Sequence, residues 1–158
     1  MRRCWVVLCA WATLACGHSN DPADGSALFL GNWECGSGER KLDCGQGTVI
    51  ADLSLSPPDA IEFVAGTTTR LSLRLPARVL APGFPGGPNC ELAFDAGQDD
   101  AVLHAESTCT ADDQNIVVHR SLARRSLSAP DQLALAATVT TSAGCEIETQ
   151  ARCSRIGN

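Results

Sequence analysis

The residues of this 158-residue chain with the best-defined chemistry are its nine cysteines. Three lie within the first sixteen residues, and six lie in the body of the chain: Cys35, Cys44, Cys90, Cys109, Cys145 and Cys153. An even number of cysteines in an exported domain is typical of a disulfide framework. Zinc sites use closely spaced pairs such as Cys-x-x-Cys, and these six cysteines have no such spacing. We therefore expect three disulfides, no metal site and no cofactor.

Hairpin geometry predicts one of the three bonds directly. Cys90 and Cys109 flank a candidate hairpin that turns near Asp99 and Asp100, which places the two cysteines opposite each other. Both also fall on the apolar face of their strands, and directly opposed strand residues are within the reach of a disulfide. We predict a bond between Cys90 and Cys109.

The other four cysteines leave two solutions open. Cys35 and Cys44 flank the turn-rich stretch 36–40, so they could face each other across a tight hairpin. Cys145 and Cys153 would then bond to each other, although an extended strand of this length spans about 26 Å and would have to bend back on itself. The alternative joins the last strand to Cys35 and Cys44, which would tie the chain ends together and close a barrel. We favour the two local pairs.

The side chains that could act as acid, base or nucleophile form no recognisable catalytic motif. His104 and Glu106 share the outer face of one candidate strand, and His119 lies on another. Members of a Ser–His–Asp triad can be distant in sequence, but the chain has no G-x-S-x-G elbow and no phosphate-binding glycine loop. We interpret the histidines as solvated surface residues and expect no catalysis. Arg124 and Arg125 form a positive spot, which we interpret as a solubilising edge device rather than an anion site.

The N-terminus has the features of an export signal. Arg2 and Arg3 precede about a dozen apolar or small residues, too few for a membrane-spanning helix. Residues 13–16, Thr-Leu-Ala-Cys, resemble the lipobox of bacterial lipoproteins, although Leu14 stands two places before the cysteine instead of the usual three. The resemblance implies that Cys16 becomes the first mature residue and carries the acyl chains (palmitate or similar) that anchor the protein. The alternative is ordinary cleavage nearby, which would give a secreted protein.

This interpretation divides the chain into a lipoprotein signal peptide at 1–15, a flexible polar tether at 16–27 and a single β-domain at 28–155. Gly17 follows the cysteine, where lipoproteins retained at the inner membrane carry aspartate, so the resemblance favours the outer membrane. Without Arg2 and Arg3, ten basic side chains face 18 acidic ones. This balance argues against nucleic-acid binding, which relies on Lys and Arg at the phosphates.

The body of the chain alternates apolar and polar residues with period two, which predicts eight or nine strands and no convincing helix. After a first strand that opens at residue 31, segments with this alternation or with a short apolar run lie at 48–55, 61–65, 71–75, 90–94, 103–109, 115–120, 122–127, 133–140 and 145–153. The polar segment 122–127 is expected as an edge strand or an exposed strand, and the stretch 81–88, rich in proline and glycine, forms a loop. Many short antiparallel strands in sequence predict a meander that closes as a small barrel or folds as a sandwich.

The first mature strand begins with Gly31-Asn32-Trp33, which resembles the G-x-W motif of lipocalins and related small β-barrels. In that family the tryptophan closes one end of the barrel against a basic residue near the C-terminus. The resemblance assigns these parts to Trp33 and to Arg152 or Arg155, through a cation–π contact. The layout of the whole chain also resembles that of small cysteine-paired bacterial lipoproteins, a resemblance that implies no particular activity.

These features together predict an envelope-anchored, non-catalytic binding or structural module. Its partners would be the membrane, through the lipid at Cys16, and an envelope protein. The alternative is a lipocalin-like carrier of a small lipophilic ligand, which requires a hollow barrel lined by leucine and valine. A hydrolase is a third hypothesis, and it requires His104 or His119 within hydrogen-bond reach of a serine or an acid.

Overall fold

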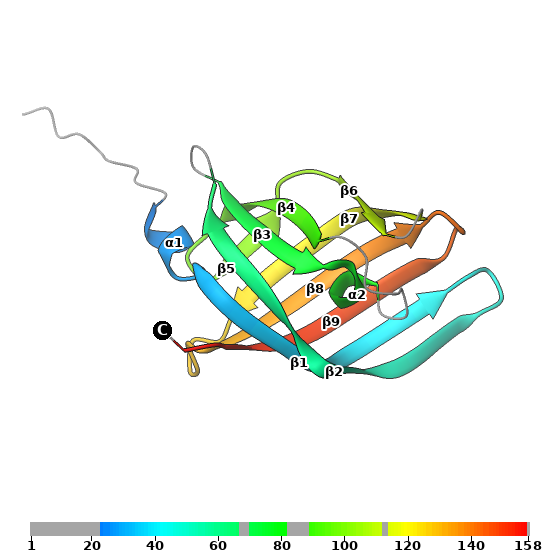
Figure 1. The fold of residues 1–158 in the computed structure, drawn as a ribbon, viewed down its shortest axis with the longest axis horizontal. Helices are drawn as coiled ribbons and strands as arrows, with labels where there is room; N and C mark the ends of the chain where they lie inside the picture. Colours follow the sequence, from blue (N-terminus) through cyan, green and yellow to red (C-terminus); the bar gives the residue numbers. More distant parts are fainter. Residues whose placement is uncertain (1–22, 67–69, 82–88, 112–113, 158) are drawn as a thin grey trace, which may run out of the picture.

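The computed structural model of the protein describes residues 23–66, 70–81, 89–111 and 114–157. Strands make up most of this part of the chain (Figure 1). Two short helices, α1 (Ala23–Ala27) and α2 (Ala77–Leu80), accompany nine strands: β1 (Gly31–Asp43), β2 (Thr48–Ala65), β3 (Leu71–Pro76), β4 (Asn89–Ala96), β5 (Asp100–Leu103), β6 (Ser107–Ala111), β7 (Gln114–Arg125), β8 (Gln132–Thr141) and β9 (Glu146–Arg155). The predicted all-β fold class is confirmed.

The strands form one antiparallel sheet that closes on itself. Their order is β5-β4-β3-β2-β1-β9-β8-β7-β6, and a further pairing of β5 with β7 closes eight strands into a barrel. β7 pairs with β6 along residues 114–118 and with β5 along residues 122–124, so β5 and β6 occupy successive parts of one edge of β7. The predicted meander therefore closes as a barrel, with β6 as one extra strand.

Side chains fill the interior of the barrel. α2 lies against β3, β8 and β9, and the Thr149 hydroxyl on β9 donates a hydrogen bond of 2.8 Å to the carbonyl oxygen of Leu80. A side chain that lined a water-sized cavity would be partly accessible, and many large core side chains are less than 2% exposed: Trp33, Phe29, Phe63, Phe94, Ile61, Leu71, Leu73, Leu75, Leu80, Leu92, Ile116 and Val79. These side chains pack as a dense core and leave no room for a ligand between them.

β2 is longer than the sequence predicts. Residues 48–55 and 61–65, expected as two strands, belong to this one strand, which continues through Pro57 and Pro58. The register of β1 shifts opposite residues 55–58, which leaves them without partners on β1. Proline is tolerated in a strand at such an irregularity because no ladder hydrogen bond needs its missing N–H.

β7 likewise joins two predicted strands, 115–120 and 122–127, into one. The expectation that residues 122–127 lie at a sheet edge is wrong, because β7 pairs with β5 and β6 on one side and with β8 on the other. Residues 23–27, assigned to the tether by their polarity, form the short helix α1. The predicted signal peptide at 1–15 and the lipidation candidate Cys16 lie outside the described residues.

The structure contains the predicted Cys90–Cys109 disulfide. The two favoured local pairs, Cys35–Cys44 and Cys145–Cys153, are wrong. Neighbouring strands pair instead, and the other two bonds are Cys35–Cys153 and Cys44–Cys145. Three disulfides indicate that the domain folds in an oxidising compartment, in the cell envelope or outside the cell.

The geometry of β1 explains why the local pairs fail. Cys35 lies in β1 and Cys44 follows its last residue, so the extended strand between them holds the two sulfurs apart. Cys35 is the register partner of Cys153 on β9, with Cα atoms 4.0 Å apart. Residues 36–40 were expected to turn, but their glycines serve the strand: a Cβ on Gly38 would lie 1.8 Å from the carbonyl oxygen of Gln150.

Trp33 closes the end of the barrel next to α1. Its Nε1 donates a hydrogen bond of 2.9 Å to the carbonyl oxygen of Phe29, and its side chain is fully buried. The guanidinium carbon of Arg155 lies 4.3 Å from the centre of the ring, within cation–π range. Arg155 also donates hydrogen bonds of 2.7 and 2.8 Å to the carbonyl oxygens of Leu30 and Leu28. One arginine thus ties the C-terminal strand to the segment that enters β1.

Of the two arginines considered as partners of Trp33, the structure selects Arg155 and not Arg152. Successive side chains of a strand point to opposite faces, and Cys153 and Arg155 share the inner face of β9. Arg152 consequently lies on the outer face, where it is exposed. The assignment of Arg152 to the barrel end is therefore wrong, because Arg152 lies on the opposite face of β9 from Arg155.

Candidate binding groove on the outer face

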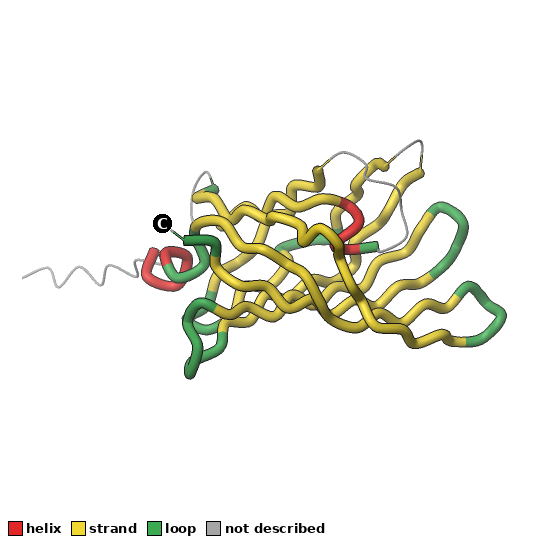
Figure 2. The backbone as a smooth tube through the Cα atoms, turned by 60° about the horizontal axis from the view of Figure 1, so that its bottom comes forward, coloured by secondary structure: helices red, strands yellow, loops and turns green. Residues whose placement is uncertain are grey.

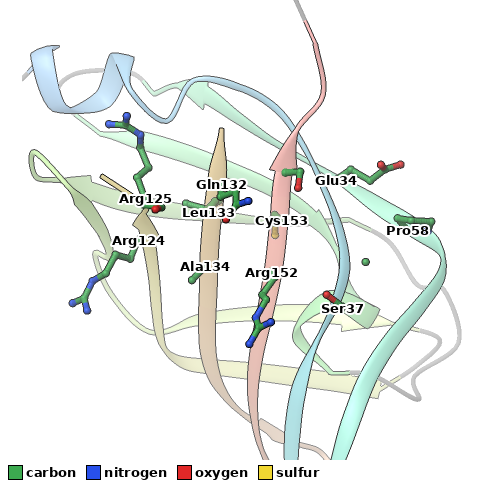
Figure 3. Close-up of a pocket in the computed structure, with 13 residues that line it drawn as sticks. Glu34, Ser37, Pro58, Arg124, Arg125, Gln132, Leu133, Ala134, Arg152 and Cys153 are labelled. Carbon is green, nitrogen blue, oxygen red and sulfur yellow. The ribbon is translucent and has the colours of Figure 1, made fainter. Parts of the chain in front are cut away.

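A groove of about 680 Å³ lies on the outside of the barrel, across β7, β8, β9 and β1 (Figure 3). Its lining includes the outward-facing residues Arg124, Ala134, Arg152 and Ser37. A second pocket of about 430 Å³ shares Ala134, Arg152 and Ser37 with it, so the two hollows adjoin. Small side chains on the strands leave this space, and longer side chains on either side form its walls.

Sheet register aligns the four residues in one row across the strands. Arg124 on β7 is the partner of Ala134 on β8, Ala134 is the partner of Arg152 on β9, and Arg152 is the partner of Ser37 on β1. Neighbouring strands are about 4.8 Å apart, so the backbones that carry the two arginines are about 10 Å apart, with a methyl group between them. Figure 3 shows Ala134 between Arg124 and Arg152.

The charges of the groove are unbalanced towards positive. Within the described residues, neither Arg124 nor Arg152 forms an ion pair with a carboxylate. Arg125 also lines the groove, and its buried Nε has no hydrogen-bond partner. Glu34 also lines the groove, and Asp100 is the register partner of Arg124. Two further acidic side chains, Glu39 and Asp52, line the adjoining hollow together with Arg152. A guanidinium group binds carboxylate and phosphate oxygens with two parallel hydrogen bonds, so this lining suits an oxyanion.

His119 makes the most extensive contacts of the histidines expected to be solvated. Its Nε2 lies 2.7 Å from the hydroxyl oxygen of Thr140, and its Nδ1 forms a hydrogen bond with the carboxylate of Glu106. The order hydroxyl, imidazole, carboxylate is that of a catalytic triad. The contact with Glu106 meets the condition of the hydrolase hypothesis, a histidine within hydrogen-bond reach of a serine or an acid, and the neighbouring hydroxyl belongs to a threonine.

The surroundings of Thr140 do not complete an acyl-transfer site. A tetrahedral intermediate needs free N–H donors beside the nucleophile. The N–H of Thr141, the next residue, already donates to the carbonyl oxygen of Cys145 at 2.9 Å. Thr140 lies within the paired strand β8 rather than on a sharp turn. The arrangement fits a surface network that holds β6, β7 and β8 together.

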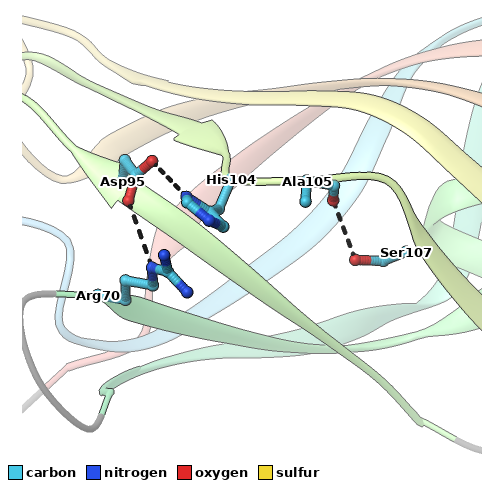
Figure 4. A network of polar contacts seen from close by, with 5 residues as sticks. All are labelled: Arg70, Asp95, His104, Ala105 and Ser107. Carbon is cyan, nitrogen blue, oxygen red and sulfur yellow. Dashed lines mark hydrogen bonds and ion pairs between the residues drawn. The ribbon is translucent and has the colours of Figure 1, made fainter.

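His104 belongs to a second surface network (Figure 4). Its Nδ1 lies 2.7 Å from a carboxylate oxygen of Asp95, whose other oxygen is 3.8 Å from Nε of Arg70. The network joins β4 to the residues beside β3 and β5. Among the described residues, the side chain of His104 forms a hydrogen bond with Asp95 and with no hydroxyl or thiol group.

Other kinds of site receive no support from the residues that the structure describes. In those ranges, no three His, Cys, Asp or Glu side chains are grouped closely enough to hold a metal ion. None of the helices found there has the length and apolarity to cross a membrane. In the described part of the chain, the outer groove is therefore the candidate surface for recognition.

Comparison with known proteins adds no identity. No protein-family model matches the chain, and no curated protein matches it. Among solved structures, it is similar to a redesigned beta barrel at 11% sequence identity and a TM-score of 0.44, over 85% of this chain and 96% of that one. A likeness at this level says nothing about function, and the fold assignment rests on the strand pairings described above.

Sequence reasoning found part of this groove and missed the rest. The sequence shows Arg124 and Arg125 as a positive spot. Its polarity suggests an edge strand there, and on an edge strand such arginines would only promote solubility. Arg152 was noticed only as a candidate partner of Trp33. The two outward arginines are aligned through Ala134 by the register of β7, β8 and β9, which the predicted meander does not specify.

Proposed function

We propose that this protein is a lipid-anchored module of a bacterial cell envelope, which binds a partner without catalysis on the outside of a filled barrel. The groove between Arg124 and Arg152 is the observation that carries the proposal. It combines the largest hollow described here with two arginines that have no ion-pair partner in the described structure. The ligand would present an oxyanion, a carboxylate or phosphate group, above Ala134.

The packed interior favours this proposal over the lipophilic carrier. A carrier needs an empty lumen, whereas the core side chains Trp33, Phe63 and Leu80 are at most 1% exposed. A ligand inside the barrel would have to displace several such side chains, and each would lose about 1.5–3 kcal/mol of burial. The envelope location is supported by the three disulfides and by the resemblance of residues 13–16 to a lipobox.

Titration with inorganic phosphate and with succinate, followed by NMR, tests the groove. We expect the Ala134 amide and methyl signals to shift with saturation for at least one of the two anions. Arg152→Gln should weaken this binding about tenfold or more, because a charge-assisted hydrogen bond contributes about 1.5–3 kcal/mol. The comparison of the two anions shows whether the groove prefers phosphate or carboxylate.

Arg120→Gln is the matched control for this experiment. Arg120 is also exposed on the outer face, and its substitution removes the same charge, but it lies outside the groove. We expect its effect on binding to stay within twofold. Equal weakening by the two variants would show that only the overall charge of the protein matters. Ala134 signals that do not shift would contradict an anion site in the groove.

A further inference from the structure

β2 has an open edge within the described part of the chain. It pairs with β1 along most of its length but with β3 only along residues 62–65. No described strand pairs with the other side of residues 48–54. Figure 1 shows this stretch at the margin of the molecule, directed away from β3. An open strand edge presents unpaired N–H and C=O groups, which can bind a further strand.

The register identifies the backbone groups at this edge. At the β8–β9 turn, the N–H of Thr141 donates to the carbonyl oxygen of Cys145, which fixes which residues of β9 hydrogen-bond to β8. Along an antiparallel strand, the N–H and C=O groups of successive residues point alternately to the two neighbouring strands. When this alternation is followed through the register from β9 to β1 and from β1 to β2, the N–H and C=O groups of the odd-numbered residues 49–53 point towards β1. The N–H and C=O groups that face the open edge therefore belong to Ile50, Asp52 and Ser54.

The side chains along the edge are apolar and acidic. Val49 is 60% exposed and Ile50 is 64% exposed, unusually high for β-branched apolar residues in a strand. On the outer face, Asp52 lies directly opposite Glu39 of β1. Neither carboxylate forms an ion pair within the described residues. Like charges directly opposite on neighbouring strands repel, and a cation beside them would remove that cost.

We propose that this edge of β2 binds an extended, basic segment of a partner protein by strand addition. The segment hydrogen-bonds through its main chain to Ile50, Asp52 and Ser54. Its lysine or arginine side chains lie on the outer face beside Asp52 and Glu39, and its alternate apolar side chains lie on the other face, near Val49. Main-chain bonds then provide affinity and the alternating side chains provide specificity.

Charge favours such a partner over a second copy of this chain. Two copies that paired through this edge would bring two Asp52 carboxylates to the same outer face. Each copy also carries a formal net charge of −6. Repulsion of this kind is a common way in which proteins prevent edge-to-edge association with themselves. The edge adjoins the hollow that Asp52 and Glu39 share with Arg152, whereas Arg124 lies outside that hollow, on β7.

Peptide binding to the purified, oxidised protein tests the proposal. The probe is a fluorescent ten-residue peptide of alternating lysine and valine, and its counterpart has glutamate in place of lysine. We expect the lysine peptide to bind and to slow amide hydrogen exchange at Ile50, Asp52 and Ser54, with affinity that falls as salt rises. We expect no binding of the glutamate peptide. Protection elsewhere in the molecule, or equal binding of the two peptides, would overturn the proposal.

Three variants refine the test. Ser54→Pro removes one N–H at the open edge and leaves the pairing with β1 intact, so we expect about tenfold weaker peptide binding. Asp52→Lys should weaken it about as much, whereas Asp99→Lys, the same charge change in an exposed turn, should stay within twofold. Unchanged binding in both edge variants would contradict the proposal.

The exchange measurement on the unaltered protein decides the matter even where a variant fails to fold. Slow exchange at Ile50, Asp52 and Ser54 without peptide, together with dimers in solution, would show that a second copy occupies the edge and would overturn the proposal. Failure of the groove is distinguishable, because Arg124→Gln changes a groove residue outside the hollow of Asp52 and Glu39 and should leave peptide binding within twofold.

Discussion

Removal of both disulfides between the first and last strands should destabilise the protein by more than the sum of the two single removals. The bonds Cys35–Cys153 and Cys44–Cys145 are nested. While one is intact, the other closes only a small ring of roughly 20 residues in the unfolded chain, worth about 3 kcal/mol. Loss of both opens a ring of roughly 100 residues as well, which contributes about 5 kcal/mol more.

We therefore expect each double alanine variant to lose about 3 kcal/mol of unfolding free energy and the quadruple variant to lose about 8 kcal/mol. Urea denaturation of the three variants measures the difference. Cys90–Cys109 provides the control, because its loop lies elsewhere in the barrel. The stability lost on its removal should simply add to the stability lost on removal of either nested bond. A quadruple variant that loses only the sum of the two pairs would contradict the nested connectivity.

Trp33→Ala should produce the largest loss of stability of any single substitution in the core. The change leaves a cavity at the end of the barrel and abolishes the hydrogen bond to the carbonyl oxygen of Phe29 and the contact with Arg155. Replacement of a buried tryptophan by alanine costs about 3–5 kcal/mol. Denaturation followed by far-ultraviolet circular dichroism measures the loss.

Two variants serve as controls for Trp33→Ala. Trp33→Phe keeps most of the packing but leaves the Phe29 carbonyl oxygen without its donor, so we expect a loss of about 1–3 kcal/mol. Leu127→Ala removes a side chain that is 80% exposed, and the stability should change by less than about 0.5 kcal/mol. A Trp33→Ala variant as stable as Leu127→Ala would show that the tryptophan does not close the barrel.

Period-two alternation predicted the strands well because each strand has one face in the core and one in solvent. β9 is the clearest case: Ile147 and Ala151 are buried, while Glu146 and Glu148 are exposed, as the pattern requires. Strand boundaries were harder to predict. Prolines end most strands. β2 continues through Pro57 and Pro58 only because of the register shift in β1 and the open edge of β2.

Disulfide connectivity and the candidate surfaces depend on which strands become neighbours, and the sequence does not contain this information locally. Gly38 looked like part of a turn, but it is needed because the backbone of β9 comes so close. The alignment of Arg124 and Arg152 in one row likewise depends on how their strands pair with β8. The open edge was expected at 122–127, from polarity, whereas it lies on β2, where the exposed residues Val49 and Ile50 are apolar.

Intact mass spectrometry of the protein isolated from the membranes of the producing cell, without reduction, tests the central claim most directly. The account predicts a chain that begins at Cys16, carries a diacylglycerol and an acyl chain, and has six hydrogens fewer than the fully reduced form. A soluble chain with an unmodified Cys16, or one with free thiols at Cys35, Cys44, Cys145 and Cys153, would contradict it.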